Sequence, residues 1–299
     1  MKSCPQFCLN LVLRQVIEDV GRLQNADELK PSQAQIDSIR KEDPDEFYDS
    51  HKLIYKSYCN YGVYRTYNNE DGKAHIMKIT HETMENEKDV NRMKSEIFLL
   101  MRINSDYILK PRDIFAWNDK LIIITEEMDY GSLEKVIEKF WKHYSEEFCK
   151  YLIYMVACGL KELHEMNILH RDLKSDNILA DSEGVVKITD LGCSAQLTAD
   201  KFARQTVLGS DNWKAPELIR GESYNKEVDI WAFGAFCYEL ANGEPPFKWG
   251  LKDGRSVLLC VTEDEVPKIP EKWSDQFNEL IQDCLKKDRQ ERPSIDDIL

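Results

Sequence analysis

The sequence has no long apolar run and no long block of basic residues. No stretch reaches the roughly 18 to 20 apolar residues that a membrane-spanning helix needs, so no membrane span is expected. The apolar start at Phe7–Leu13 is short and no small-residue cleavage site follows it, so no signal peptide is expected either. No run of five or more basic residues appears, which leaves both cytoplasmic and nuclear placement open.

The sequence also lacks paired cysteines and an excess of positive charge. Its nine cysteines include no C-x-x-C pair, and the closest two, Cys4 and Cys8, have no second pair or histidine to complete a zinc site. Free thiols in a reducing, intracellular compartment are therefore expected. With 54 acidic against 40 basic residues the net charge is −14, which predicts basic peptides rather than nucleic acid as partners.

The composition is that of an ordinary globular protein, 42% hydrophobic and 10% aromatic. At 299 residues the chain fits one two-lobed domain with a short appendage, or two small domains. Apolar residues at three- and four-residue steps predict an amphipathic helix over Phe7–Leu23, followed by a polar linker with a short helix at Gln33–Arg40. Packing against the domain, partner binding and inhibition all stay open for this region.

From about Tyr48 the pattern changes to short strands, with one helix predicted at Glu85–Ile103. The strand segments are Leu53–Tyr55, Gly62–Tyr67, Ala74–Thr80, Tyr107–Lys110, Ile114–Trp117 and Leu121–Thr125. These are six segments, whereas five strands and one helix are expected for the first lobe. After Gly131 helices dominate, and the predicted ones are Leu133–Phe140, Ser145–His164, Lys226–Asn242 and Gln276–Lys286.

The residues that carry chemistry gather in one loop, His170–Asn177, just before the short predicted strand Ile178–Ala180. The loop holds an Asp, a Lys and an Asn at fixed offsets. Phosphoryl transfer uses these types: a carboxylate takes the hydroxyl proton, an ammonium faces the moving group, and an amide oxygen holds a divalent metal. Asp190 follows at the end of a second predicted strand, Val185–Thr189, where a carboxylate can chelate that metal.

The loop pattern H-R-D-L-K-x-x-N resembles the catalytic loop of the eukaryotic protein kinases, and its Lys resembles their serine/threonine-specific branch. Further motifs resemble D-F-G, A-P-E and D-x-W-x-x-G, namely Asp190–Gly192, Ala215–Glu217 and Asp229–Gly234. The resemblance runs from about Asp43 to Leu299 and is greatest to the Ste-twenty group, the PAK-like branch in particular. It implies an α+β bilobal fold. A five-stranded antiparallel sheet and a helix would form the N-lobe (48–128), a mainly helical C-lobe would cover 129–299, and residues 1–47 would form an extension.

The resemblance further implies a serine/threonine protein kinase that uses ATP with Mg²⁺ or Mn²⁺. Asp172 would act as the base and Lys174 would stabilise the transferred group, while Asn177 and Asp190 would hold the metal. Lys78 would position the α- and β-phosphates. The other residues implied at the ATP site are Glu96, Tyr55, Val63, Ile76, Glu126, Met128 and Leu179.

The long polar segment after Gly192 is implied to regulate activity. Thr206 is the candidate activating phosphosite, whose phosphate would pair with Arg171, and a merely exposed hydroxyl is the alternative. Ser210 would hydrogen-bond the catalytic Asp and Lys. An upstream activating kinase would then be a partner, beside the protein substrates.

Protein substrates are implied to carry basic residues upstream of the acceptor, which Asp176 and Glu239 would receive. Three residues, Glu217, Asp229 and Arg292, are interpreted as braces for the catalytic loop and activation segment rather than as substrate contacts.

The sequence departs from the family at the nucleotide loop, where Lys56, Tyr58 and Tyr61 replace all three glycines. Ile76 also stands where a smaller Ala is expected. Because glycine lets the backbone approach phosphates, weaker ATP binding is expected. A pseudokinase that acts as a scaffold or binding module is therefore the alternative, which the complete set of catalytic residues opposes. A small-molecule kinase is a third hypothesis, disfavoured by the A-P-E motif at Ala215–Glu217.

Overall fold

The computed structural model describes residues 32–56, 61–80, 96–118, 120–197, 203–204, 209–248 and 256–299. The chain divides into two compact units, of which the first ends at Glu127 and the second begins at Met128, with Ser105–Ile108 belonging to the second. The predicted helix Phe7–Leu23, the phosphosite Thr206 and the loop residue Tyr58 lie outside the described residues.

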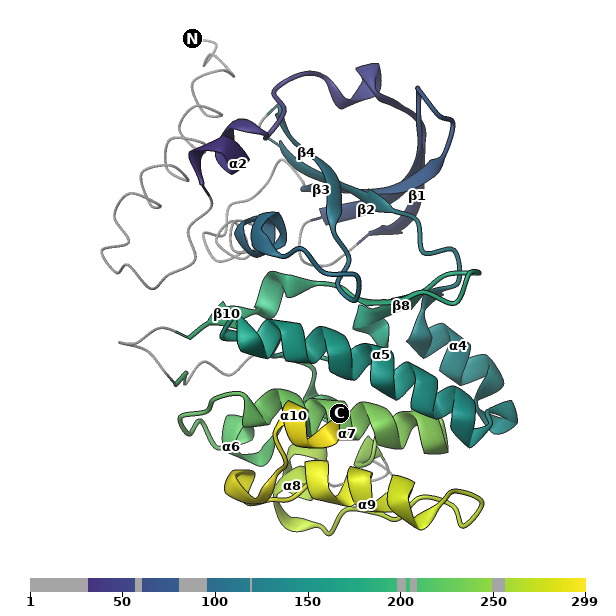
Figure 1. The fold of residues 1–299 in the computed structure, drawn as a ribbon, viewed down its shortest axis with the longest axis vertical. Helices are drawn as coiled ribbons and strands as arrows, with labels where there is room; N and C mark the ends of the chain where they lie inside the picture. Colours follow the sequence, from purple (N-terminus) through teal and green to yellow (C-terminus); the bar gives the residue numbers. More distant parts are fainter. Residues whose placement is uncertain are drawn as a thin grey trace. The chain divides into compact units, whose positions relative to one another are not determined.

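The first unit is built on a five-stranded antiparallel sheet in the order β1-β2-β3-β5-β4 (Figure 1). The strands are β1 (Tyr48–Lys56), β2 (Tyr61–Asn68), β3 (Ala74–Thr80), β4 (Pro111–Trp117) and β5 (Lys120–Glu126). Residues 96–102 are helical and form the described part of the predicted helix Glu85–Ile103. Buried Met77, Phe115 and Ile124 form a small core on one face of the sheet, and the five-stranded prediction is confirmed.

Residues 32–47 pack on this first unit. The short helix α2 (Gln33–Asp37) begins with a reciprocal capping box between Ser32 and Gln35, and the Gln35 side chain donates to Met101 O at 2.5 Å. Arg40 N then donates to Ile114 O at 2.9 Å, beside β4, and a single turn of 3-10 helix, η1 (Pro44–Glu46), leads into β1. The segment is thus hydrogen-bonded both to the helical residues and to the edge strand.

The predicted strand Tyr107–Lys110 is wrong. These residues make a single parallel bridge between Ile108 and Ile188, in which Ile188 N donates to Tyr107 O at 2.8 Å. Ile108 is fully buried. The apolar pattern that predicts a strand therefore reflects the burial of Ile108 in the second unit. The separately predicted strand Ile114–Trp117 is present as part of Pro111–Trp117.

The second unit is mainly helical. Its helices are α4 (Leu133–Phe140), α5 (Glu146–Glu165), α6 (Pro216–Ile219), α7 (Glu227–Asn242), α8 (Val257–Glu263), α9 (Asp275–Cys284) and α10 (Ile295–Ile298). Short strands β6 (Gly131–Ser132), β8 (Ile178–Ala180) and β9 (Val186–Ile188) form one small sheet, and β7 (Ile168–Leu169) pairs with β10 (Ala195–Gln196). Single turns of 3-10 helix lie at η2 (Trp141–His143), η3 (Ser175–Asn177), η4 (Leu191–Cys193), η5 (Asp211–Trp213) and η7 (Arg289–Glu291).

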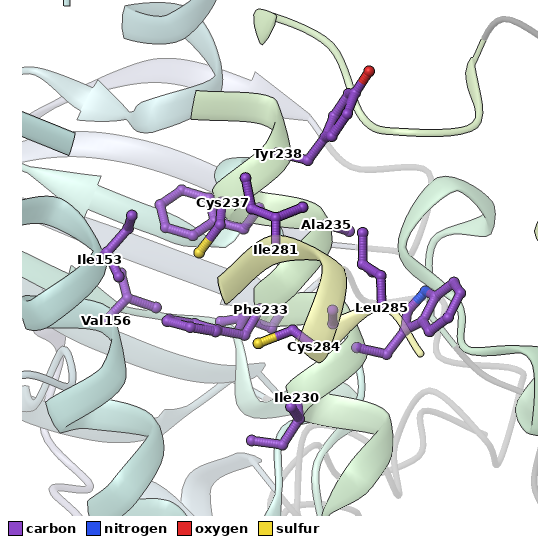
Figure 2. Packing of buried hydrophobic residues seen from close by; sticks show 14 of the residues in the cluster. Ile153, Val156, Ile230, Phe233, Ala235, Cys237, Tyr238, Ile281, Cys284 and Leu285 are labelled. Atoms are coloured by element: carbon purple, nitrogen blue, oxygen red, sulfur yellow. The ribbon is translucent and has the colours of Figure 1, made fainter. Parts of the chain in front are cut away.

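Helix α7 is the centre of the second unit. Its residues from Val228 to Ala241 are all buried, as expected for a helix covered on every side, and α5 and α9 both pack against it (Figure 1). Figure 2 shows Phe233 of α7 between Val156 of α5 and Cys284 of α9. This helix also carries two acidic residues of the candidate site.

None of the helices in the described ranges is long and apolar enough to cross a membrane.

Candidate active site

Lys78 and Glu96 form a bidentate ion pair within the first unit. Lys78 lies on β3 and Glu96 begins the described part of the helix at 96–102. The Lys78 ammonium donates to both carboxylate oxygens, at 2.7 and 2.8 Å. Only 17% of the Lys78 side chain and 7% of the Glu96 side chain are exposed. The pair is thus shielded from solvent and holds a positive charge at a fixed place on the sheet.

Two other residues expected near ATP, Val63 and Ile76, lie on the face of the sheet that carries Lys78. In the pairing of β2 with β3, Val63 lies opposite Lys78 and Arg65 lies opposite Ile76. Directly opposed residues of an antiparallel pair share a face of the sheet. Val63 and Ile76 are half-buried there. Tyr55 is 51% exposed. One contact on this face has no signal in the sequence: the Tyr61 ring centroid lies 4.6 Å from the Lys78 ammonium.

Asp172 is held in the second unit by a hydrogen-bond network. Ser210 N donates to its Oδ1 at 2.8 Å, and Asn177 Nδ2 donates to Oδ2 at 3.3 Å and to the Asp172 carbonyl at 2.8 Å. The Lys174 ammonium lies 3.6 Å from Oδ2 and donates to the Ser210 hydroxyl at 2.7 Å. The structure therefore brings together the Asp, Lys, Asn and Ser that the sequence singled out.

Asn177 and Asp190 have the chemistry of metal ligands. The Asn177 amide nitrogen donates to Asp172, so the amide oxygen is the atom that would bind a metal. Asp190 adopts a left-handed conformation, with φ of 62°, and its carboxylate accepts from Gly192 N at 3.3 Å. Oxygen ligands of this kind fit Mg²⁺ or Mn²⁺. The described residues contain no cluster of three His, Cys, Asp or Glu that could hold a metal by itself, so further oxygens would have to come from phosphates and water.

Asp229 fixes the backbone of the catalytic loop. It is fully buried at the start of α7, and its carboxylate accepts from His170 N and Arg171 N, both at 2.8 Å. His164 Nε2 lies 3.0 Å from the same carboxylate. Burial alone would raise the pKa of Asp229, but the hydrogen bonds and the neighbouring histidines lower it below its ordinary value. An ionised Asp229 can thus brace the residues just before Asp172.

Arg171 has a positive φ of 67°, and its guanidinium is held by hydrogen bonds. Its Nε donates to Cys193 O at 2.6 Å, Nη2 to Ser194 O at 3.1 Å, and Nη1 to the Tyr224 hydroxyl at 3.2 Å. The role of Tyr224 has no signal in the sequence, because that residue is 53 positions away. Arg171 thereby ties the catalytic loop to the segment after Asp190.

Glu217 and Arg292 form a buried bidentate pair, at 2.6 and 2.9 Å. The Arg292 side chain is fully buried and that of Glu217 is 3% exposed. Arg292 also donates to the carbonyls of Lys286 and Glu227, both at 2.9 Å. These hydrogen bonds tie the A-P-E motif, through Glu217, to Arg292 near the last residues of the sequence, as a structural brace would.

Three acidic residues, Asp176, Glu239 and Glu134, lie close enough to affect one another's ionisation. Glu239 of α7 is 4% exposed and its Oε1 accepts from the Ser175 hydroxyl at 2.8 Å. Burial is the main cause that raises its pKa to about 8, and Asp176 and Glu134 raise it further. Burial and a hydrogen bond with Asp176 also raise the pKa of Glu134. Glu134 was not expected from the sequence, since no motif includes it.

The three remaining residues expected at the ATP site belong to different units of the chain. Glu126 ends β5 in the first unit. Met128 is buried in the second unit, where its carbonyl accepts from Gly131 N at 2.9 Å. Leu179 lies on β8 opposite Ser132. Adenine contacts for these three residues stay predictions.

Comparison with known proteins agrees with the motifs. Residues 60–299 match the family described as protein kinase domain. Serine/threonine-protein kinase pakC of Dictyostelium discoideum is 34% identical over 267 residues, which are 88% of this chain and 55% of that protein. Serine/threonine-protein kinase cst-1 of Caenorhabditis elegans is 31% identical over 235 residues, 78% of this chain and 46% of that protein.

Myosin-IIIa of Homo sapiens is 32% identical over 274 residues, 86% of this chain and 16% of that protein. The chain thus spans about half the length, or less, of these curated relatives. Kinases named pakA, pakB and pakC are among the similar proteins, so the predicted likeness to the PAK-like branch is confirmed.

Proposed function

This chain belongs to the protein kinase domain family, and we propose that it is a serine/threonine protein kinase that transfers the γ-phosphoryl group of ATP to protein hydroxyls. The observation that carries the proposal is the network around Asp172, in which Lys174, Asn177 and Ser210 surround one carboxylate. A scaffold protein would have no need of this arrangement.

In the proposed reaction Asp172 accepts the proton of the substrate hydroxyl and orients its oxygen toward the γ-phosphorus. The bond between that phosphorus and the β,γ-bridging oxygen breaks as the new bond to the hydroxyl oxygen forms. Lys174, 3.6 Å from the Asp172 carboxylate, stabilises the negative charge on the group in transit. Ser210 holds both side chains in place, since its N–H binds one and its hydroxyl binds the other.

Asn177 and Asp190 would hold the divalent metal, which, when bound, neutralises charge on the phosphates. Lys78 would bind phosphate oxygens, and its pairing with Glu96 keeps the ammonium oriented through both carboxylate oxygens. The shielding of this pair from solvent strengthens its electrostatic effect. Removal of Glu96 would therefore misplace Lys78 without removing its charge.

The protein substrates proposed here carry basic residues upstream of the acceptor. Asp176 in the catalytic loop and Glu134 beside it supply negative charge. The raised pKa of Glu239 keeps its buried carboxyl largely protonated near neutral pH, and within the described residues its Oε2 accepts no hydrogen bond. An arginine that reached this carboxyl would favour its ionised form and pair with it. Regulation is proposed to involve phosphorylation of Thr206 by an upstream kinase, with Arg171 as the phosphate's partner.

Phosphate transfer from labelled Mg-ATP to a generic basic protein tests the proposed function. Wild type, Asp172→Asn and Asp275→Asn would be compared, the last being an exposed aspartate at the start of α9. We expect transfer by wild type and by Asp275→Asn, and loss of at least about 100-fold in Asp172→Asn. Absence of transfer from all three, even after treatment with an upstream kinase, would contradict the proposal and favour the scaffold.

A further inference from the structure

Tyr61 shares a face of the sheet with Lys78. Tyr61 is the first residue of β2 and pairs with Thr80 of β3. Val63, two residues further along β2, pairs with Lys78. Side chains two residues apart lie on the same face of a strand, so Tyr61 is the diagonal neighbour of Lys78, at a separation that long side chains can bridge.

The Tyr61 ring lies against the Lys78 ammonium. The ring centroid is 4.6 Å from Nζ, inside the range of a cation–π contact. An ammonium has three N–H donors, and Glu96 accepts hydrogen bonds from Nζ at both of its oxygens. The Tyr61 ring face therefore covers part of the Lys78 ammonium, which is the group that would bind phosphate in the proposed reaction.

Gly62 helps to fix the direction of this contact. It is buried, and a Cβ at its position would lie 2.7 Å from Cε2 of Tyr64. The Tyr64 ring therefore lies across the strand at Gly62, on the face opposite to Tyr61. Pairing of Tyr61 and Gly62 with Thr80 and Ile79 holds the backbone between the two rings.

We propose that Tyr61 competes with the nucleotide phosphates for Lys78 and thereby sets the affinity of this chain for ATP; the inference rests on the proposed kinase function. A phosphate oxygen binds an ammonium at about 2.8 Å, so the ring has to turn away from Nζ before an oxygen can approach from its side. The apparent affinity is then the intrinsic affinity reduced by the fraction of molecules in which Lys78 is uncovered.

Calorimetric dissociation constants for Mg-ADP and for adenosine test this inference. A cation–π contact predicts that Tyr61→Ala tightens Mg-ADP binding by about two- to thirtyfold, because the phosphates no longer displace a ring. Adenosine carries no phosphate, so its affinity should not change. Tyr61→Phe keeps the aromatic face and should behave as wild type.

Tyr67→Ala is the matched control. Tyr67 lies on the same strand and face, and its ring covers Arg65 at 5.5 Å instead of Lys78, so its removal should leave both affinities unchanged. Equal tightening of adenosine and Mg-ADP in Tyr61→Ala, no change, or weaker Mg-ADP binding would each overturn the inference. If wild type transfers phosphate but Tyr61→Ala binds Mg-ADP no more tightly, the competition fails while the kinase function stands.

A readout without nucleotide makes the test independent of activity. The rate at which an amine-reactive ester acylates Lys78, followed by peptide mass spectrometry, should rise in Tyr61→Ala and stay at the wild-type value in Tyr61→Phe. Thermal unfolding would establish that each variant is folded. If no variant binds nucleotide, the proposed function and the competition both fail; if only Tyr61→Ala binds, the competition is supported.

Discussion

At the residue scale, Glu239 is the side chain whose ionisation should affect stability most clearly near neutral pH. Its pKa is raised to about 8, mainly by burial, against an ordinary value near 4.5. A group whose pKa is higher in the folded state contributes stability below its unfolded pKa and loses it as the pH rises through the folded value. The window for Glu239 is therefore about pH 4.5 to 8.

We predict that the free energy of unfolding of wild type falls between pH 5 and pH 8 relative to that of Glu239→Gln, by on the order of 1 kcal/mol per pH unit. Glutamine keeps the hydrogen bond from Ser175 but cannot ionise. Urea unfolding of both proteins across this range measures the difference. Parallel curves would show that Glu239 is not neutral in the folded state at pH 5.

The Glu217–Arg292 pair gives a second prediction at this scale. Replacing one partner of a buried pair leaves the other charge uncompensated, so Arg292→Leu should lower the free energy of unfolding by about 3–5 kcal/mol. The double variant with Glu217→Leu should recover part of that loss. Lys150→Met is the control, because Lys150 is 58% exposed where it pairs with Glu146, and such pairs contribute less than about 1 kcal/mol. Equal losses in Arg292→Leu and Lys150→Met would contradict this view.

At the scale of elements, the packing of α7 on α9 depends on Gly234. A Cβ at this position would lie 2.5 Å from Cβ of Cys284, closer than two such atoms can approach. Gly234→Ala should therefore destabilise the second unit by about 1–3 kcal/mol through overpacking, although alanine favours helix formation.

A double-mutant cycle with Cys284→Gly checks this prediction by denaturant unfolding. Removing the opposing Cβ makes room for the new methyl group, so the double variant should be more stable than the sum of the two single changes predicts. Simple additivity would mean that the helices separate without strain and that the close approach is not needed.

The elements also show what could be predicted from the sequence. The loop around Asp172 could be predicted because its functional residues are neighbours in the chain, and the sheet because its strands have clear patterns. The predicted strand at Tyr107–Lys110 is wrong because an apolar run has the same pattern whether it pairs in a sheet or is buried elsewhere. The contacts of Tyr61 with Lys78 and of Tyr224 with Arg171 depend on sequence-distant packing, which no local pattern encodes.

At the scale of the whole molecule, the acidic balance of the chain and the local acidic groups predict the same substrate preference. The net charge is −14, and Asp176 lies in the catalytic loop with Glu134 beside it. We predict that a peptide library shows preference for arginine upstream of the acceptor, and that Asp176→Asn lowers kcat/KM for basic peptides by about tenfold, consistent with loss of one charge-assisted contact. Equal turnover of acidic and basic peptides would exclude this preference.

The central proposal is that phosphoryl transfer by this chain requires both Lys78 and Asp172. The most direct test is the single-turnover rate of transfer from Mg-ATP in Lys78→Met, Asp172→Asn and the double variant. Residues that serve one step are non-additive, so we predict that each single change removes nearly all transfer and that the double variant is no slower than the slower single. Full transfer in either single variant, or losses that multiply, would contradict the claim.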